Sequence, residues 1–253
     1  MQLSISNIAW DTTEDTSVAQ LLRRYGVAAV DVAPSKYFPD FALATDADIR
    51  RVRNWWHDQG VCIAGMQALL YGSQGLNVFG SPQTQRALLN HLDHVFRIGA
   101  GLGGTRLVFG SPKNRDRNGL DDAQAHDRAV AFFRKVGEVA ERHGVILCLE
   151  PVPPIYGANF MTTSQTCAEV VRDIQHPAIR MQLDTAAMQI NGENVVDVVV
   201  KTADVIGHIH LSEPQLMPFG DGAGDYAKVR DAIVQHLPNH VATIEMADTK
   251  DEP

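Results

Sequence analysis

The chain has 253 residues, a formal net charge of −8 and 45% hydrophobic residues, a composition typical of a globular protein. Its pI near 5.6 argues against a surface that neutralises a nucleic-acid backbone and favours a small-molecule partner. No apolar run approaches about 18 residues, so no membrane span is expected. Three scattered cysteines without a CxxC pair, and an N-terminus without a signal-peptide pattern, predict a cytoplasmic protein.

Eight short apolar runs alternate with segments of helical period along the chain. The predicted strands begin near Leu3, Val27, Val61, Arg106, Val145, Ile179, Ile206 and Val241. Their nearly continuous apolar character is typical of parallel strands that are covered on both faces. The alternation predicts an α/β fold, a (β/α)₈ TIM barrel that forms a single domain over residues 1–253. A doubly wound sheet needs a phosphate-binding glycine turn after its first strand, and residues 8–11 lack one.

Two helices are the clearest. Residues 121–143 repeat apolar side chains every three or four positions and stop at Gly144. Another helix is predicted to begin at Ser81-Pro82, an N-cap followed by proline at the first helical position. After Glu245 only eight residues remain, so the barrel is predicted to lack its final closing helix. Either a neighbouring subunit covers that side of the barrel or the chain is short.

Four residues of metal-ligating type stand at the C-terminal ends of the last four predicted strands: Glu150, Asp184, His210 and Glu245. Their steps of 34, 26 and 35 residues match one strand-plus-helix unit each. Because a TIM barrel assembles its active site at that end, three carboxylates and one imidazole are expected to converge. Such a donor set predicts one divalent metal ion, with Mn²⁺ expected first and Mg²⁺ or Co²⁺ as alternatives.

The predicted chemistry is proton abstraction next to a carbonyl group. A cation at this position can hold a carbonyl and a neighbouring hydroxyl, which makes the α-carbon proton more acidic. Glu150 and Glu245 are expected to remove and return a proton through an enediolate, as in an isomerase or epimerase of a sugar or related polyhydroxy carbonyl compound. A metal-dependent lyase or dehydratase would begin with the same step, and the sequence leaves that alternative open.

Four stretches resemble the sugar phosphate isomerase/epimerase superfamily, whose xylose isomerase-like TIM barrel also includes the ketose 3-epimerases. They are Cys148-Leu-Glu150-Pro151, Leu183-Asp184-Thr185, His208-Ile-His210 followed by Ser212-Glu213, and Ile244-Glu245-Met246. The resemblance implies that the four strand-end residues are metal ligands and that both glutamates form the acid/base pair. It also implies a sugar-like substrate and a homodimer or homotetramer.

Two positions depart from the ketose 3-epimerase pattern. Those enzymes carry a histidine three residues after the aspartate and an arginine six residues after the ligand histidine. This chain has Ala187 and Leu216 there. Both family side chains normally contact substrate oxygens, so the departures disfavour a simple free ketose. The apolar loop 213–220 favours a less polar or differently substituted substrate, unless it packs only on its own barrel.

Further substrate contacts are predicted at Trp10, Tyr71, Lys113, Tyr156, Asn159, His208 and Glu213. Trp10 and Tyr71 follow early strands and can form an aromatic wall, while Tyr156 and Asn159 belong to a segment that can act as a lid. Lys113 can hold a phosphate or carboxylate, with a solvated loop as the alternative. Strand alternation places His208 one layer deeper, on the inward face with Cys148, Gln182 and Thr243.

Other functions fit less well. A phosphodiesterase like endonuclease IV needs additional histidines at the ends of the early strands and a basic groove, and this sequence provides neither. A Schiff-base aldolase needs a lysine at an inward strand end, whereas Lys113 lies beyond a Gly-Ser-Pro turn. A barrel that binds a ligand without turnover remains an alternative, because a fold does not determine a function.

Overall fold

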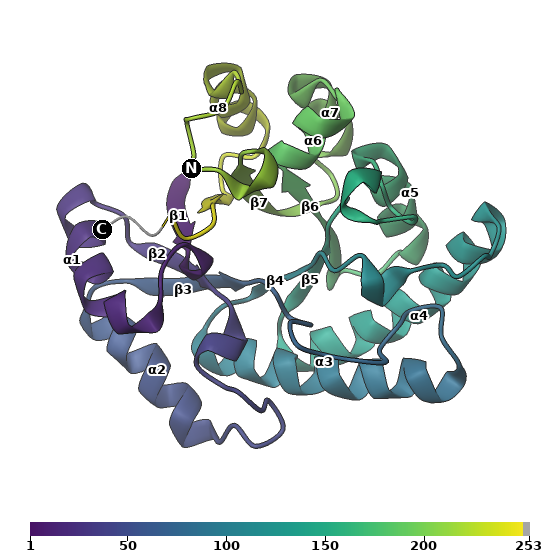
Figure 1. The fold of residues 1–253 in the computed structure, drawn as a ribbon, viewed down its shortest axis with the longest axis horizontal. Coiled ribbons are helices and arrows are strands. Elements are labelled where there is room, and N and C mark those ends of the chain that lie inside the picture. Colours follow the sequence, from purple (N-terminus) through teal and green to yellow (C-terminus); the bar gives the residue numbers. More distant parts are fainter. Residues whose placement is uncertain (250–253) are drawn as a thin grey trace.

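The computed structural model describes residues 1–249, which form a closed barrel of eight parallel strands (Figure 1). Each strand pairs with the next along the chain, and the last pairs with the first. The strands are β1 Gln2–Ser6, β2 Ala29–Val32, β3 Cys62–Met66, β4 Arg106–Phe109, β5 Ile146–Leu149, β6 Ile179–Asp184, β7 Ile206–Ser212 and β8 Val241–Glu245. Each begins within two residues of its predicted start. The predicted TIM barrel is confirmed.

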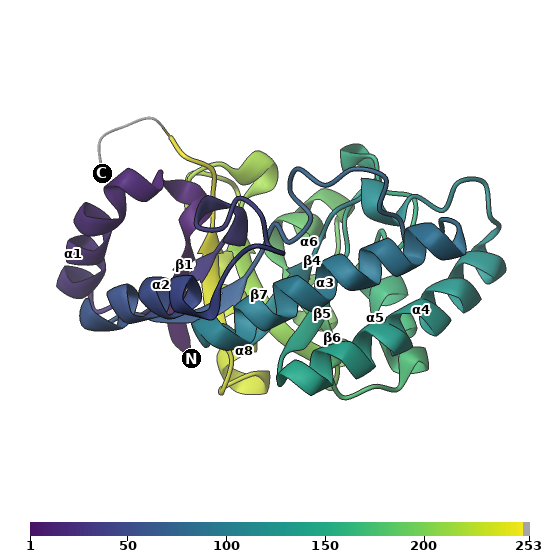
Figure 2. The same ribbon diagram turned by 90° about the horizontal axis from the view of Figure 1, so that it is seen from below.

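Helices surround the barrel in both views (Figures 1 and 2). They are α1 Asp15–Tyr25, α2 Asp46–Asp58, α3 Pro82–Leu102, α4 Asp122–His143, α5 Ser164–Ile174, α6 Thr185–Asn191, α7 Val195–Thr202 and α8 Tyr226–His236. Both α6 and α7 lie between β6 and β7, and within residues 1–249 no helix follows β8. None of the described helices combines the length and apolar character needed to cross a membrane.

Local chemistry sets the ends of the two long helices. The Asp121 side chain accepts a hydrogen bond from the Gln124 backbone N–H at the start of α4, and Gly144 ends this helix with φ of 69°. That left-handed conformation is one that glycine adopts without steric cost. Ser81 caps α3, and Pro82 takes its first position. Both predicted helices are confirmed.

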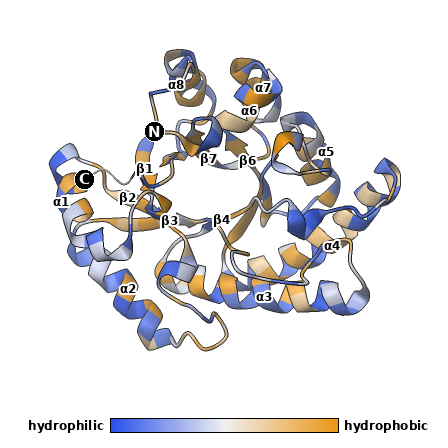
Figure 3. Cartoon of the chain, in the orientation of Figure 1, coloured by the Kyte–Doolittle hydropathy of each residue, from blue (hydrophilic) through white to orange (hydrophobic). Residues whose placement is uncertain are grey.

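The hydrophobic core lies mainly between the strands and the surrounding helices. Trp56, Phe96 and Phe133 are completely or almost completely buried there, and Phe109 contributes from β4. Each buried side chain of this size contributes about 1.5–3 kcal/mol to folding. Figure 3 shows the strands mostly in hydrophobic colours, with hydrophilic residues along the outer helices.

The centre of the barrel is more polar than this outer core. Gln182, His208 and Thr243 are buried, and so is Cys148, as their predicted inward position requires. Asp31 of β2 is buried as well and contacts His208 directly. Burying polar groups is unfavourable unless they are paired, so packing alone does not explain the polar residues at the centre of the barrel. It supports the strand ends where the candidate site lies.

Candidate functional site

The four predicted metal ligands come together at the C-terminal ends of β5 to β8. Glu150, Asp184, His210 and Glu245 each offer one donor atom, and these atoms lie within 4.8 Å of one another. His210 Nδ1 is 3.3 Å from Glu245 Oε2 and 4.0 Å from Glu150 Oε1. The parallel strands therefore bring together side chains that are up to 95 residues apart in the sequence.

Burial and mutual repulsion disfavour the ionised forms of these carboxylates. Burial, together with the charges of Asp184 and Glu245, raises the pKa of Glu150 to about 8. Burial and Glu245 likewise raise the pKa of Asp184 to about 6. Burial disfavours a charged imidazole, but the Glu245 and Asp31 carboxylates outweigh it and raise the pKa of His210 well above its ordinary value. The site thus concentrates negative charge in a buried space.

These features fit a divalent cation. Within residues 1–249, neither ring nitrogen of His210 makes a well-aligned hydrogen bond, although the ring is fully buried. Buried polar atoms without such partners are uncommon and call for a structural or functional reason. A cation would satisfy Nδ1 and relieve the repulsion among the three carboxylates, and three oxygens with one nitrogen suit Mn²⁺, Mg²⁺ or Co²⁺.

Neighbouring groups fix the orientation of two of the carboxylates. The Ala187 backbone N–H donates to Asp184 Oδ1 at 2.7 Å, and the Ser212 hydroxyl donates to Oδ2 at 2.7 Å. Gln67 Nε2 donates to Glu245 Oε1 at 2.8 Å. Each carboxylate therefore keeps lone pairs free while its rotation is restricted, which prepares it for binding before a ligand arrives.

The position of Glu150 depends on a hydrogen bond to its backbone and on the space that a neighbouring glycine leaves for its carboxylate. Arg115, which is fully buried, donates to the Glu150 carbonyl oxygen at 2.6 Å. Gly110 faces the Glu150 carboxylate so closely that an added Cβ atom would lie 1.8 Å from Oε2. The residue after β4 must therefore be small for Glu150 to reach the site.

Two cavities, of about 420 and 620 Å³, open onto the carboxylates. Glu150 and Glu245 line both cavities, together with Gly110 and Leu216. The side chains of the two glutamates are 15% and 14% exposed, whereas His210 has no exposed side-chain surface. The two glutamates are thus accessible to a small molecule from either cavity, and the histidine lies beneath them.

The smaller cavity contains the two departures from the ketose 3-epimerase pattern. Ala187 and Leu216 both line it, as do the predicted contacts Tyr156 and Glu213. Glu213 is buried and accepts a hydrogen bond from the Gly222 backbone N–H at 3.3 Å. The cavity wall is therefore mostly apolar at the two places where the family pattern has polar side chains.

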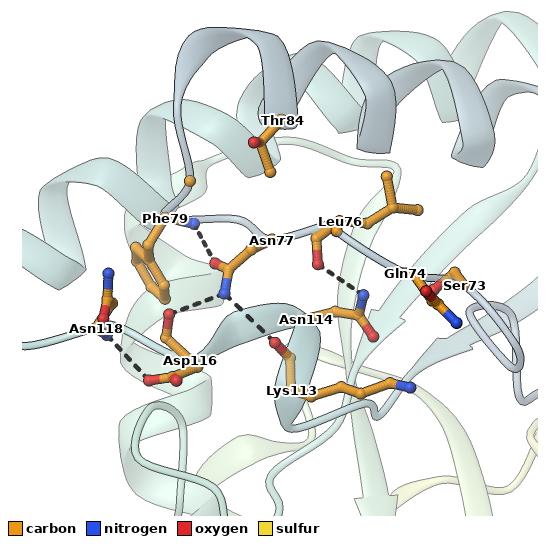
Figure 4. Close-up of a pocket in the computed structure, with 12 residues that line it drawn as sticks. Ser73, Gln74, Leu76, Asn77, Phe79, Thr84, Lys113, Asn114, Asp116 and Asn118 are labelled. Atoms are coloured by element: carbon orange, nitrogen blue, oxygen red, sulfur yellow. Dashed lines mark hydrogen bonds between the residues drawn. The ribbon is translucent and has the colours of Figure 1, made fainter.

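The larger cavity extends toward the loops after β3 and β4. The predicted contacts Tyr71 and Lys113 line it, and Tyr71 is 76% exposed. Lys113 also lines a third, polar cavity of about 510 Å³, which Figure 4 shows between segments 73–84 and 113–118. There Asn77 donates to the carbonyl oxygens of Lys113 and Asp116. Lys113 thus connects a polar recess with the cavity that holds the glutamates.

Three predicted substrate contacts lie elsewhere. Trp10 does not line either glutamate cavity: its side chain is in the core, where Nε1 donates to Asp15 at 2.8 Å. Asn159 hydrogen-bonds to Asp116 at 2.7 Å and lines a separate surface cavity. His208 lies below the cavities. Its Nε2 donates to Asp31 at 2.5 Å. The aromatic-wall, lid and direct-contact roles expected of these three residues find no support in their positions.

Four residues around the site were not predicted from the sequence: Asp31, Gln67, Gly110 and Ser212. Asp31 is near the end of β2, and Gln67 directly follows β3. Both are polar residues at the end of an apolar run, which is the same signal that identifies the candidate ligands on the later strands. Although burial opposes ionisation, His208 and His210 lower the pKa of Asp31.

Residues 19–253 match the sequence profile of the xylose isomerase-like TIM barrel. D-psicose 3-epimerase from Enterocloster bolteae is 31% identical over 106 residues, which are 42% of this chain and 35% of that protein. L-ribulose 3-epimerase from Mesorhizobium japonicum is also 31% identical over 106 residues, again 42% of this chain and 35% of that protein. The aligned segment thus spans about a third of the length of these curated relatives.

The structural comparison extends over nearly the whole chain. The crystal structure of D-psicose 3-epimerase with D-tagatose from Clostridium cellulolyticum H10 superposes with a TM-score of 0.81 and covers 98% of this chain and 87% of that chain. At 19% sequence identity this likeness concerns the fold. The sequence profile, by contrast, identifies the family and covers most of the chain. The chain belongs to the family of xylose isomerase-like TIM barrels, as its strand-end motifs predicted.

Proposed function

We propose that the chain is a divalent-metal-dependent isomerase or epimerase that acts on a sugar or a related polyhydroxy carbonyl compound. The observation that carries this proposal is the convergence of Glu150, Asp184, His210 and Glu245, with the two glutamates facing both cavities. The names of the curated relatives, D-psicose 3-epimerase and L-ribulose 3-epimerase, support the same reaction class.

The four side chains would hold one cation, Mn²⁺ being the first candidate and Mg²⁺ or Co²⁺ the alternatives. When bound there, a divalent cation would orient the carbonyl and hydroxyl oxygens of the substrate and make the proton next to the carbonyl more acidic. His210 has no exposed side-chain surface, and Asp184 lines the smaller cavity but accepts hydrogen bonds at both carboxylate oxygens, so we assign these two residues to holding the cation.

Glu150 and Glu245 would act as the acid/base pair. They come from β5 and β8, with two strands between them, so they can face a bound substrate from different sides. One glutamate takes the proton from the α-carbon, and the resulting enediolate receives a proton from the other. Return to the opposite face of the same carbon inverts its configuration. Each transfer typically contributes about 10²–10⁴-fold to the rate.

For the substrate, we propose a less polar or substituted keto-sugar in preference to a simple free ketose. Ala187 and Leu216 stand where the ketose 3-epimerase pattern has two polar side chains, and Tyr156 adds an aromatic surface to the smaller cavity. An apolar wall of this kind binds a hydroxyl-poor flank of a substrate better than a free sugar, because unpaired hydroxyl groups lose their hydrogen bonds to water on burial.

Solvent-exchange measurements test this function. The Mn²⁺-loaded protein is incubated in D₂O with D-psicose, L-ribulose and substituted keto-sugars, and NMR follows deuterium incorporation next to the carbonyl. Glu150→Gln and Glu245→Gln are each expected to slow turnover by at least about 10²-fold. The control Glu138→Gln changes an exposed glutamate on α4 and should leave the rate unchanged.

Unchanged exchange and turnover in both site variants would contradict the acid/base assignment. The products separate the remaining alternative: recovery of an isomer of unchanged formula supports isomerisation, whereas loss of water indicates a dehydratase that uses the same first proton transfer.

A further inference from the structure

The His210 ring lies between the two glutamates of the site and the Asp31 carboxylate. Its Nδ1 faces Glu245 at 3.3 Å and Glu150 at 4.0 Å, on the side of the proposed cation. Its Nε2 faces Asp31 Oδ2 at 3.4 Å, on the opposite side of the ring. Neither the Asp31 nor the His210 side chain has any exposed surface, so water does not screen the interaction between them.

Asp31 is anchored independently of His210. It belongs to β2, far from β7 in the order of strands around the barrel, so its carboxylate reaches into the barrel centre. There His208 Nε2 donates a hydrogen bond to the same Oδ2 atom at 2.5 Å. The Thr243 hydroxyl lies 3.4 Å from His208 Nε2. Side chains from β2, β7 and β8 thus form one buried polar group beneath the site.

The backbone around Asp31 is fitted to its carboxylate. Gly65 of β3 is the register partner of Asp31, next to an irregularity in the pairing of the two strands. A Cβ atom at position 65 would lie 2.8 and 2.9 Å from the two Asp31 carboxylate oxygens and 2.7 Å from the Arg106 carbonyl oxygen. Such contacts are closer than packed atoms tolerate, so the position of the carboxylate depends on a glycine there.

We propose that Asp31 is a positioning residue for the metal centre, holding the His210 ring so that Nδ1 points at the three carboxylates of the site. This inference rests on the proposed metal-dependent function. A histidine that binds a metal commonly donates its other ring N–H to a carboxylate, which fixes both the tautomer and the ring orientation. Here Asp31 is the acceptor that faces Nε2, the nitrogen turned away from the cation.

Asp31, His208 and His210 could alternatively form a second cation site, since their donor atoms also lie within 4.8 Å of one another. The structure favours the positioning role. The 2.5 Å contact between His208 and Asp31 is a hydrogen bond, and none of the three residues lines either glutamate cavity. A cation there would have to displace that hydrogen bond and enter a closed space.

Metal titration of the apo-protein tests the proposal without relying on turnover. Asp31→Asn keeps the size of the side chain and removes its charge, and Co²⁺ binding is followed by calorimetry and by visible absorption. We expect about 10–100-fold weaker binding and an altered Co²⁺ spectrum. The control Asp15→Asn changes another buried aspartate, which accepts hydrogen bonds from Trp10 and Tyr37 and belongs to neither candidate metal cluster, and should bind Co²⁺ like the wild type.

A second measurement uses the unmodified protein and stands even if Asp31→Asn does not fold. In ¹⁵N-labelled protein loaded with diamagnetic Mg²⁺, His210 should carry its proton on Nε2, in slow exchange with water. A proton on Nδ1, wild-type Co²⁺ affinity in Asp31→Asn, or two bound cations per chain would each overturn the inference. Turnover with unchanged affinity in Asp31→Asn refutes only this inference. Weakened binding in a protein without isomerase activity refutes only the proposed function.

Discussion

Gln67 Nε2 donates a hydrogen bond to Glu245 Oε1 at 2.8 Å and so connects the loop after β3 with the end of β8. The other Glu245 oxygen, Oε2, lies 3.3 Å from His210 Nδ1. The Gln67 side-chain carbonyl is buried and has no hydrogen-bond partner among the residues that the structure describes. Burying this unpaired carbonyl oxygen reduces the stability of the fold. The hydrogen bond to Glu245 is the favourable contact of the same amide, which indicates that its role is to orient Glu245.

Gln67→Leu is expected to lower kcat by about 10–100-fold, because a hydrogen bond to a charged group contributes about 1.5–3 kcal/mol. Metal affinity should change less, since Oε2 is the oxygen that faces His210. Steady-state kinetics on the best substrate, together with a Co²⁺ titration, separate the two effects. A wild-type kcat in Gln67→Leu would show that Glu245 does not need this contact.

The pKa shifts predict how the stability of the metal-free protein depends on pH. Glu150 has a folded-state pKa of about 8 against an ordinary value of 4.5, so the unfolded chain releases this proton first as pH rises. Asp184, with a pKa of about 6, and His210, whose pKa is also raised, act in the same direction. The free energy of unfolding of the metal-free protein should therefore fall between pH 4.5 and 8.

Thermal unfolding with and without Mn²⁺ checks this dependence. At a Mn²⁺ concentration a hundredfold above Kd, binding adds about 2.7 kcal/mol of stability, which raises Tm by about 5–10 °C in a chain of this size. Because binding requires the ionised carboxylates, the gain should be larger at pH 8 than at pH 6. Glu150→Gln should flatten the pH dependence of the metal-free protein. An equally steep decline in this variant would exclude Glu150 as its source.

The barrel and the convergence of the four strand-end residues were predictable because they depend on repeating patterns. Eight buried strands must be apolar along most of their length, so a charged residue where such a run ends is conspicuous. The closed barrel then fixes where those ends meet. Glu150, Asp184, His210 and Glu245 could therefore be placed together without knowing any loop conformation.

The supporting residues were harder to predict because their roles depend on distances across the barrel. Asp31 and Gln67 contact residues that are 177 and 178 positions away in the sequence, and no periodic pattern encodes such contacts. The position of Trp10 also depends on contacts that the sequence pattern does not encode. This residue follows β1, where an aromatic residue can reach the mouth of the barrel, but it turns into the core toward Asp15 and Trp56.

Gly110→Ala tests how closely Glu150 is fitted to its surroundings. The added methyl group would lie 1.8 Å from Glu150 Oε2, so the carboxylate has to move. We expect the protein to fold, because the obstructing atom is the end of a side chain, and to bind Co²⁺ at least tenfold more weakly because one ligand is displaced. Circular dichroism and calorimetry measure the two outcomes. Wild-type affinity would mean that the Glu150 carboxylate can still reach the metal beside the added methyl group.

The pair Ala187 and Leu216 provides a test of substrate preference. Both residues line the smaller glutamate cavity, where the ketose 3-epimerase pattern has histidine and arginine. The double variant Ala187→His/Leu216→Arg should raise kcat/KM for D-psicose and L-ribulose about tenfold or more, because each restored hydrogen bond to a substrate oxygen contributes about 1 kcal/mol. Met217→Arg is the control: it adds the same charge to the same loop but lines neither glutamate cavity. An equal gain in the control would point to general electrostatic attraction. No gain in the double variant would mean that these two positions do not determine whether a free ketose is accepted.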